Sequence, residues 1–159
     1  MCGIAGIFLK DEGLHSCLGQ LLTIMLEPLG DRGPDSAGIA IYGEAVDEMM
    51  KITVQSENPQ YDFEKLAENI KIQTGKNVIV NPIDSHAVIK VSELDISTVS
   101  DFLKKETKIR VMSLGAKVEI YKEVGAPKQV LERFGVSSMR GTHGIGHTRM
   151  ATESKVTTL

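Results

Sequence analysis

The chain opens with Met1-Cys2-Gly3-Ile4-Ala5-Gly6-Ile7-Phe8-Leu9, a cysteine followed by a short apolar run. The apolar run, with its β-branched residues, predicts a strand over 3–9 that is buried on both faces. If Met1 is removed, Cys2 carries both a thiol and a free α-amine. An α-amine has a pKa of about 7.7–8.0, so it can take a proton from its own thiol near neutral pH. The alternative is that Cys2 is a small buried hydrophobe ahead of a core strand.

Length and composition describe one globular domain: 159 residues, 42% hydrophobic and 25% charged. A net charge of −3 and an aromatic content of 4% argue against nucleic acid and against an anionic membrane surface as partners. No stretch approaches the roughly 18–20 apolar residues that a membrane span requires. Cys2 and Cys17 provide no disulfide framework, which predicts a reducing, cytoplasmic setting, with Cys17 in or near the core.

Beyond the first strand, the hydrophobic pattern predicts an α+β fold in which helices and strands are mixed along the chain. Helices are predicted at 14–29, 59–70, 95–105 and 127–135. Strands are predicted at 37–42, 49–54, 77–81, 86–91, 108–114 and 117–122. The segment 141–152 is dense in glycine and polar residues, and no element is assigned to it.

Three separated segments carry the chemistry: Cys2-Gly3-Ile4, Arg32-Gly33-Pro34-Asp35-Ser36-Ala37-Gly38 and Gly146-His147-Thr148-Arg149-Met150-Ala151-Thr152. In this order they resemble the glutaminase domain of the class II glutamine amidotransferases, which are N-terminal nucleophile hydrolases. The last segment most resembles the amidotransferase domain of archaeal-type glutamate synthases. The resemblance covers about 2–42 and 141–157.

The resemblance implies part of the αββα sandwich of the N-terminal nucleophile hydrolases, with a small α+β lobe inserted at about 58–138. Nothing in this lobe indicates chemistry, and its charges are expected to form a solvated face. Residues 1–159 would form a partial amidotransferase domain, because the sequence ends abruptly at Leu159. The Asn-Gly pair that supplies the family's oxyanion hole, and an aspartate that binds the substrate's α-amine, would both come later.

The resemblance also implies a role for each matching residue. Cys2 would attack the side-chain amide of L-glutamine, releasing ammonia for a synthase domain or subunit, in glutamate synthesis. Arg149 would bind the substrate's α-carboxylate, which a planar guanidinium matches well. Thr152 and His147 would belong to the same substrate site, although Thr152 is equally well explained as a strand residue.

Arg32 and Gly33 match a turn that lies beside the nucleophile in the family and orients it. Asp35 is expected to tie this turn together, and a local ion pair between Arg32 and Asp35 is the structural alternative. His143 and His147 are four residues apart, but the glycines between them argue against a helix and so against a shared metal site. No metal or cofactor is expected.

Two other functions stay open at this point. A regulatory or scaffolding domain would keep the amidotransferase fold without turnover, and the missing oxyanion segment favours it. A different hydrolase with an N-terminal cysteine would act on another amide. Arg149 argues against that second alternative, because a guanidinium at this place suits a free amino-acid carboxylate.

Overall fold

The computed structural model describes residues 2–58 and 60–151. Its internal contacts divide the chain into two compact units. The first unit comprises residues 1–44 and 120–159, and the second comprises residues 45–119. The second unit therefore lies, in sequence, between the two parts of the first, where a lobe at about 58–138 was expected.

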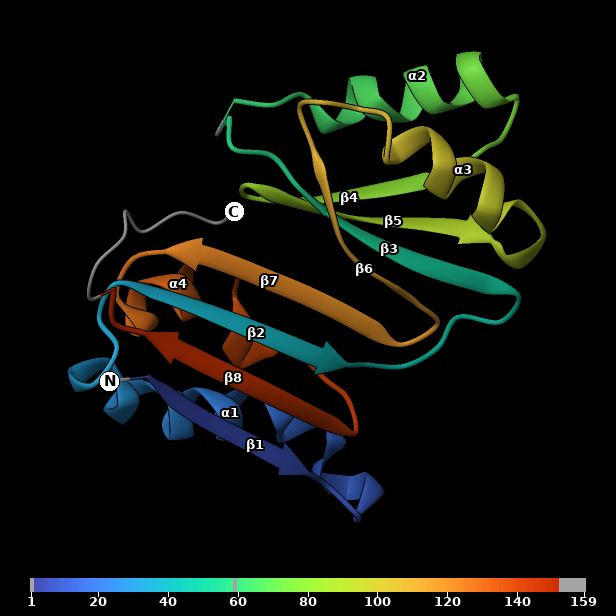
Figure 1. The fold of residues 1–159 in the computed structure, drawn as a ribbon. Coiled ribbons are helices and arrows are strands. Elements are labelled where there is room, and N and C mark those ends of the chain that lie inside the picture. The colour runs from blue at the N-terminus through green and yellow to red at the C-terminus, as the bar shows by residue number, and fades with distance from the viewer. Residues whose placement is uncertain (1, 59, 152–159) are drawn as a thin grey trace. The chain divides into compact units, whose positions relative to one another are not determined.

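The first unit is built on a four-stranded sheet in the order β1-β8-β2-β7 (Figure 1). Its strands are β1 (Gly3–Phe8), β2 (Ser36–Tyr42), β7 (Val118–Val124) and β8 (His143–Arg149). β8 pairs antiparallel with both β1 and β2, and β7 runs opposite to β2 (Figure 1). The last strand in the sequence thus lies between the first two.

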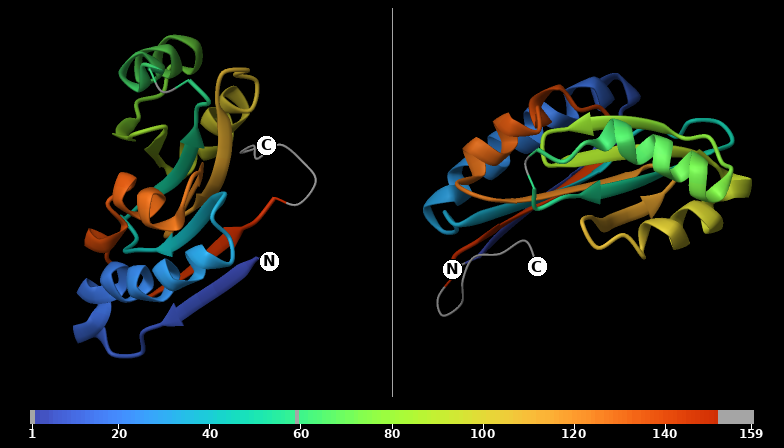
Figure 2. Two further views of the ribbon diagram at one scale, coloured as in Figure 1. Left: turned by 90° about the vertical axis from the view of Figure 1, so that its left-hand side faces the viewer. Right: turned by 90° about the horizontal axis from the view of Figure 1, so that it is seen from above.

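Helices α1 (Leu18–Leu26) and α4 (Pro127–Arg133) contact each other and cover one face of this sheet (Figure 2). The predicted helix at 14–29 is split into three parts. Its α-helical part ends at Leu26, ahead of Pro28, which has no N–H to continue an α-helix. Short 3₁₀ segments flank α1 and follow α4: η1 (Glu12–Cys17), η2 (Glu27–Asp31) and η4 (Val136–Ser138).

Helix α1 lies directly on the backbone of β8, and two glycines make this approach possible. A Cβ on Gly146 would lie 2.2 Å from a methyl carbon of Leu26, and one on Gly144 would lie 3.0 Å from Leu22. On the opposite face of the sheet, the apolar side chains of β1 are not buried: Ile4 is 74% exposed and Phe8 is 64% exposed. The prediction that this strand is buried on both faces is therefore wrong, because the helices cover only one of them.

The second unit is a continuous βαββαβ chain, the split βαβ or ferredoxin-like arrangement. Its elements are β3 (Met49–Gln55), α2 (Phe63–Thr74), β4 (Ile79–Ile83), β5 (His86–Ser92), η3 (Glu93–Asp95), α3 (Ile96–Leu103) and β6 (Arg110–Gly115). The strands form an antiparallel sheet in the order β4-β5-β3-β6.

Helices α2 and α3 pack against each other and against this sheet over an apolar core. The core includes Ile52, Val54, Leu66, Ile70, Ile89, Val99 and Leu103, each at most 1% exposed. Helix α2 begins four residues later than predicted, because Asp62 accepts a hydrogen bond of 2.9 Å from the Lys65 N–H and caps its first turn. Gly75, with φ of 71°, ends the helix in the left-handed conformation.

Candidate functional site

The pairing of β8 brings the three chemical segments to one end of the first sheet. Gly3 pairs with Thr148, and Ser36 pairs with Arg149. Continuing the β1–β8 register by one residue sets Cys2 opposite Arg149. The start of β1, the start of β2 and the end of β8 meet at this end (Figure 1). We call Cys2, Arg32, Gly33 and Arg149 the strand-end site.

The alternation of side chains along β1 and β8 shows which face of the sheet Cys2, His147 and Arg149 occupy. Gly146 and Thr148 face α1 and the turn that follows it. Because successive residues of a strand point to opposite faces, His147 and Arg149 belong to the face opposite α1. His147 pairs with Ile4 and is half-buried, and Cys2 is exposed. Cys2, His147 and Arg149 are thus brought to one end and one face.

The turn that contains Arg32 and Gly33 rests against the end of β8. The backbone N–H groups of Arg32 and Gly33 each donate to the Leu29 carbonyl at 3.1 Å. Gly33 is buried, and a Cβ there would lie 2.7 Å from the Arg149 nitrogen and from the Thr148 carbonyl carbon. Only a glycine permits this approach. The turn is therefore held beside Arg149, while the Arg32 side chain is exposed.

Asp35 joins the same turn to the chain beyond β8. Its backbone N–H donates to the Arg149 carbonyl at 3.1 Å, and its carboxylate Oδ2 accepts from the Ala151 N–H at 2.7 Å. Its carbonyl accepts from the Gly125 N–H at 2.9 Å. The expectation that Asp35 ties the turn together is confirmed.

Thr148 is a part of the site to which the sequence analysis assigned no role. Its side chain is completely buried, and its Oγ1 donates to the Leu29 carbonyl at 3.2 Å. A Cβ on Gly3 would lie 3.0 Å from this oxygen. Thr148 therefore fixes β8 to the middle of η2 and lies against the residue after Cys2. The sequence signal that could have indicated this role is a polar residue that alternates with glycines at the inward positions of a strand.

Thr152 and His143 are the remaining residues that the sequence singles out. Thr152 lies outside the described residues. His143 is at the other end of β8, where its ring stacks on Tyr42 with centroids 4.0 Å apart. Within residues 2–58 and 60–151, no group of three or more His, Cys, Asp or Glu side chains could hold a metal ion. No helix in the same part of the chain is long and apolar enough to cross a membrane.

Comparison with known proteins gives two relatives and no matching family model. The chain is 51% identical over 160 residues to the glutamine amidotransferase-like protein GlxB of Rhizobium meliloti, with all of the chain and 53% of that protein covered. It is 34% identical over 172 residues to a protein of Methanothermobacter thermautotrophicus named "Putative glutamine amidotransferase", with 98% of the chain and 54% of that protein covered. The chain is therefore homologous to proteins named for glutamine amidotransfer, and it spans about half their length.

Proposed function

We propose that the chain carries the nucleophile and the amino-acid-binding arginine of a class II glutaminase. The observation that supports this most is the antiparallel register that brings the start of β1 and the end of β8 together. If the pairing continues by one residue beyond Gly3 and Thr148, Cys2 lies opposite Arg149, as the proposal requires. The names of the two relatives support glutamine as the substrate.

In the proposed reaction, the sulfur of Cys2 attacks the carbonyl carbon of the glutamine side-chain amide. The free α-amine of Cys2 takes the thiol proton and passes it to the departing nitrogen, so that the C–N bond breaks and ammonia leaves. A thioester remains between Cys2 and the glutamyl group. Water then attacks the thioester, which releases glutamate and restores the thiol. This chemistry needs the removal of Met1.

Arg149 binds the α-carboxylate of glutamine in this proposal. Two parallel N–H donors match the two oxygens of a carboxylate, which orients the substrate as well as attracting it. His147 lies on the same face, two residues along β8, and contributes to the same proposed substrate site. Arg32 and Gly33 position the site through the backbone contact of their turn with Arg149. We propose that Thr152 completes this side of the substrate site.

Ammonia released at this site would pass to a synthase domain or subunit, in the synthesis of glutamate. Free ammonia is protonated in water, so a protected route to the acceptor is expected. The second unit would be an insertion within the amidotransferase domain. We propose that the acceptor lies outside this chain, which spans about half the length of its two relatives.

The chain offers a matched pair of cysteines for the decisive test, because Cys2 is exposed and Cys17 is half-buried. The full-length protein is treated with a glutamine analogue that carries an electrophilic side-chain carbonyl, and its intact mass is measured. We expect loss of Met1 and one covalent label, which Cys2→Ala abolishes and Cys17→Ala keeps. A retained Met1, or labelling that survives Cys2→Ala, rules the mechanism out. An unlabelled but glutamine-binding protein would instead support the scaffolding alternative.

Arg149→Lys tests the carboxylate contact, with Arg140→Lys as a control at an exposed position away from the strand ends. Lysine keeps the charge but lacks the bidentate fork. We expect KM for glutamine to rise roughly tenfold or more, since a hydrogen bond to a charged group contributes about 1.5–3 kcal/mol. Arg140→Lys should leave KM unchanged, and equal effects of the two variants would remove Arg149 from the substrate site.

A further inference from the structure

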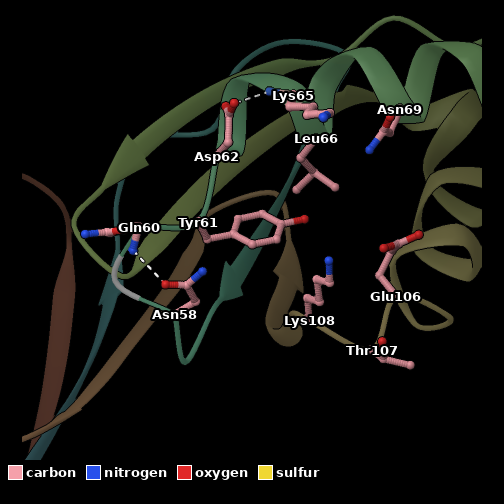
Figure 3. A pocket seen from close by; sticks show the side chains of 10 residues that line it. All are labelled: Asn58, Gln60, Tyr61, Asp62, Lys65, Leu66, Asn69, Glu106, Thr107 and Lys108. Carbon is pink, nitrogen blue, oxygen red and sulfur yellow. Dashed lines mark hydrogen bonds between the residues drawn. The ribbon is translucent and has the colours of Figure 1, made fainter.

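A pocket of about 330 Å³ opens in the second unit, within the range of small-molecule sites, about 300–1,000 Å³. Its lining comes from the segment before α2, from the first turns of α2 and from the segment between α3 and β6 (Figure 3). The strand-end site belongs to the first unit, so the pocket is not part of it. From sequence, the charged residues of this unit are expected only to form a solvated face.

The topology of the second unit explains why a crevice forms at this place. β3 and β6 are neighbours, with Gln55 paired to Arg110. The chain leaves β3 toward α2, which packs against β4, whereas it enters β6 from α3, which packs against β5. The two connections therefore diverge from adjacent strands, which leaves a crevice between them. The Ser56 hydroxyl donates to the Lys108 carbonyl at 3.1 Å and fixes the two connections at the base of the divergence.

Tyr61 and Leu66 give the pocket an apolar wall. The Tyr61 ring packs edge-on against the buried ring of Phe63, with centroids 4.9 Å apart, and this contact fixes its orientation. The Tyr61 hydroxyl points into the pocket (Figure 3). Burial raises the pKa of Tyr61 above its usual value of about 10, and the carboxylates of Glu106 and Asp62 raise it further. The phenol is therefore a neutral donor and acceptor at neutral pH.

The charges around the pocket balance. Two lysines, Lys65 and Lys108, and two carboxylates, Asp62 and Glu106, line it. Asp62 already accepts from the Lys65 N–H as the helix cap. The Glu106 carboxylate, the Lys108 ammonium and the Asn69 amide all point toward the interior (Figure 3). Two carboxylates beside the lysines repel a polyanion such as a nucleotide, whereas a zwitterion meets an opposite charge at each end.

We propose that this pocket binds a free α-amino acid. The α-ammonium pairs with Glu106, the α-carboxylate pairs with Lys108, and the aliphatic part of the side chain lies against Tyr61 and Leu66. Asn69 and the Tyr61 hydroxyl provide hydrogen bonds to a polar side-chain end. This site acts independently of Cys2, and it stands or falls separately from the proposed glutaminase.

The test is an NMR titration of the full chain, in the Arg149→Ala background so that the strand-end site does not contribute. The proteinogenic L-amino acids are added one at a time, up to roughly 10 mM, which covers weak small-molecule binding. Inorganic phosphate and succinate serve as anions without an ammonium group. We expect at least one amino acid to shift the backbone signals of Tyr61, Asn69 and Glu106, and neither anion to do so with similar affinity.

Matched charge variants decide whether the amino acid binds in this pocket. Glu106→Gln and Lys108→Gln should each weaken binding about tenfold or more, as expected for the loss of a charge-assisted hydrogen bond. Glu68→Gln and Lys105→Gln change exposed residues outside the lining and should leave the affinity unaltered. The proposal is overturned if no amino acid shifts these signals, if phosphate or succinate binds as tightly, or if the two pairs of variants behave alike. If a charge variant unfolds, Tyr61→Phe provides a second test of binding in the pocket, because it keeps the ring packing.

Discussion

The two units use similar architectures in different ways. Each has a four-stranded antiparallel sheet with helices on one face. The first unit is assembled from two distant stretches of chain, and the second from one continuous stretch. In the first, the candidate site is produced by strand pairing itself, because β8 carries Arg149 to the beginning of β1. In the second, the pocket is produced by connections that diverge after pairing is complete. The strand-end site therefore depends on the pairing of the strands in the first sheet. The pocket depends instead on the segments that connect the elements of the second unit.

The largest loss of structure should come from removing β8. A chain of residues 1–142 lacks the strand that joins β1 to β2, so we expect the first unit to lose its structure. The second unit has all its strands within 45–119 and should keep its own, whether in this truncated chain or expressed alone. NMR spectra of residues 1–142 and 45–119, compared with the whole chain, measure both outcomes. Dispersed signals from β1 and β2 without β8 would contradict the comparison.

Gly33→Ala should have the next largest effect, and it again concerns the first unit. The added Cβ would meet backbone atoms of Thr148 and Arg149 at 2.7 Å, and backbone cannot move aside as a side chain can. We expect a loss of about 1–3 kcal/mol in the free energy of unfolding, typical of overpacking. Urea unfolding, followed separately by NMR signals from each unit, provides the measurement.

Gly30→Ala is the matched control in the same turn. A Cβ there would have its nearest neighbour, in Pro127, at 3.6 Å, an ordinary contact. Alanine also restricts the unfolded chain, so we expect no loss and a gain of up to about 0.4–1 kcal/mol. Opposite signs at Gly30 and Gly33 would show that the close approach matters, and equal losses would mean that any alanine disturbs the turn.

The smallest predicted effect is a pH dependence confined to the second unit. Because the pKa of Tyr61 is raised by burial, and then by Glu106 and Asp62, the folded chain holds the phenol proton more tightly than the unfolded chain. The stability linked to this proton is fully present below about pH 10, the pKa of an unfolded tyrosine, and is lost as pH rises through the folded pKa. Unfolding free energies above this pH should fall more steeply for the natural chain than for Tyr61→Phe. Parallel curves would contradict the raised pKa.

Most of the elements could be predicted from hydrophobic period, because their apolar side chains make the core. β8 could not. Its inward positions are Gly144, Gly146 and Thr148, which carry almost no hydrophobic signal, since α1 occupies the space that side chains would fill. The strand at the centre of the first sheet was therefore the one that the pattern missed. The pattern that could have predicted this strand is the alternation of small inward residues with larger outward ones.

The candidate sites divide in the same manner. Cys2, Arg149 and the Arg32 turn could be chosen from sequence because three short motifs, each weak alone, are specific when they occur together in this order. Thr148 is in the same motif, but its contact with the Leu29 carbonyl is a property of three-dimensional packing. The pocket around Tyr61 draws its lining from the start of α2 and the segment before it, and from residues 106–108 farther along the chain. Its ordinary lysines and carboxylates form no motif that a sequence search would find.

The central position of β8 also has a consequence for the order of events during synthesis. A chain is made from its N-terminus, so Cys2 emerges early and Arg149 only after the whole second unit has been made. Until β8 enters between β1 and β2, no guanidinium stands opposite Cys2. If Cys2 and Arg149 form the proposed substrate site, a growing chain exposes the Cys2 thiol before that site can form. Because β8 follows the second unit in the sequence, the site is assembled only after residues 45–119 have been translated.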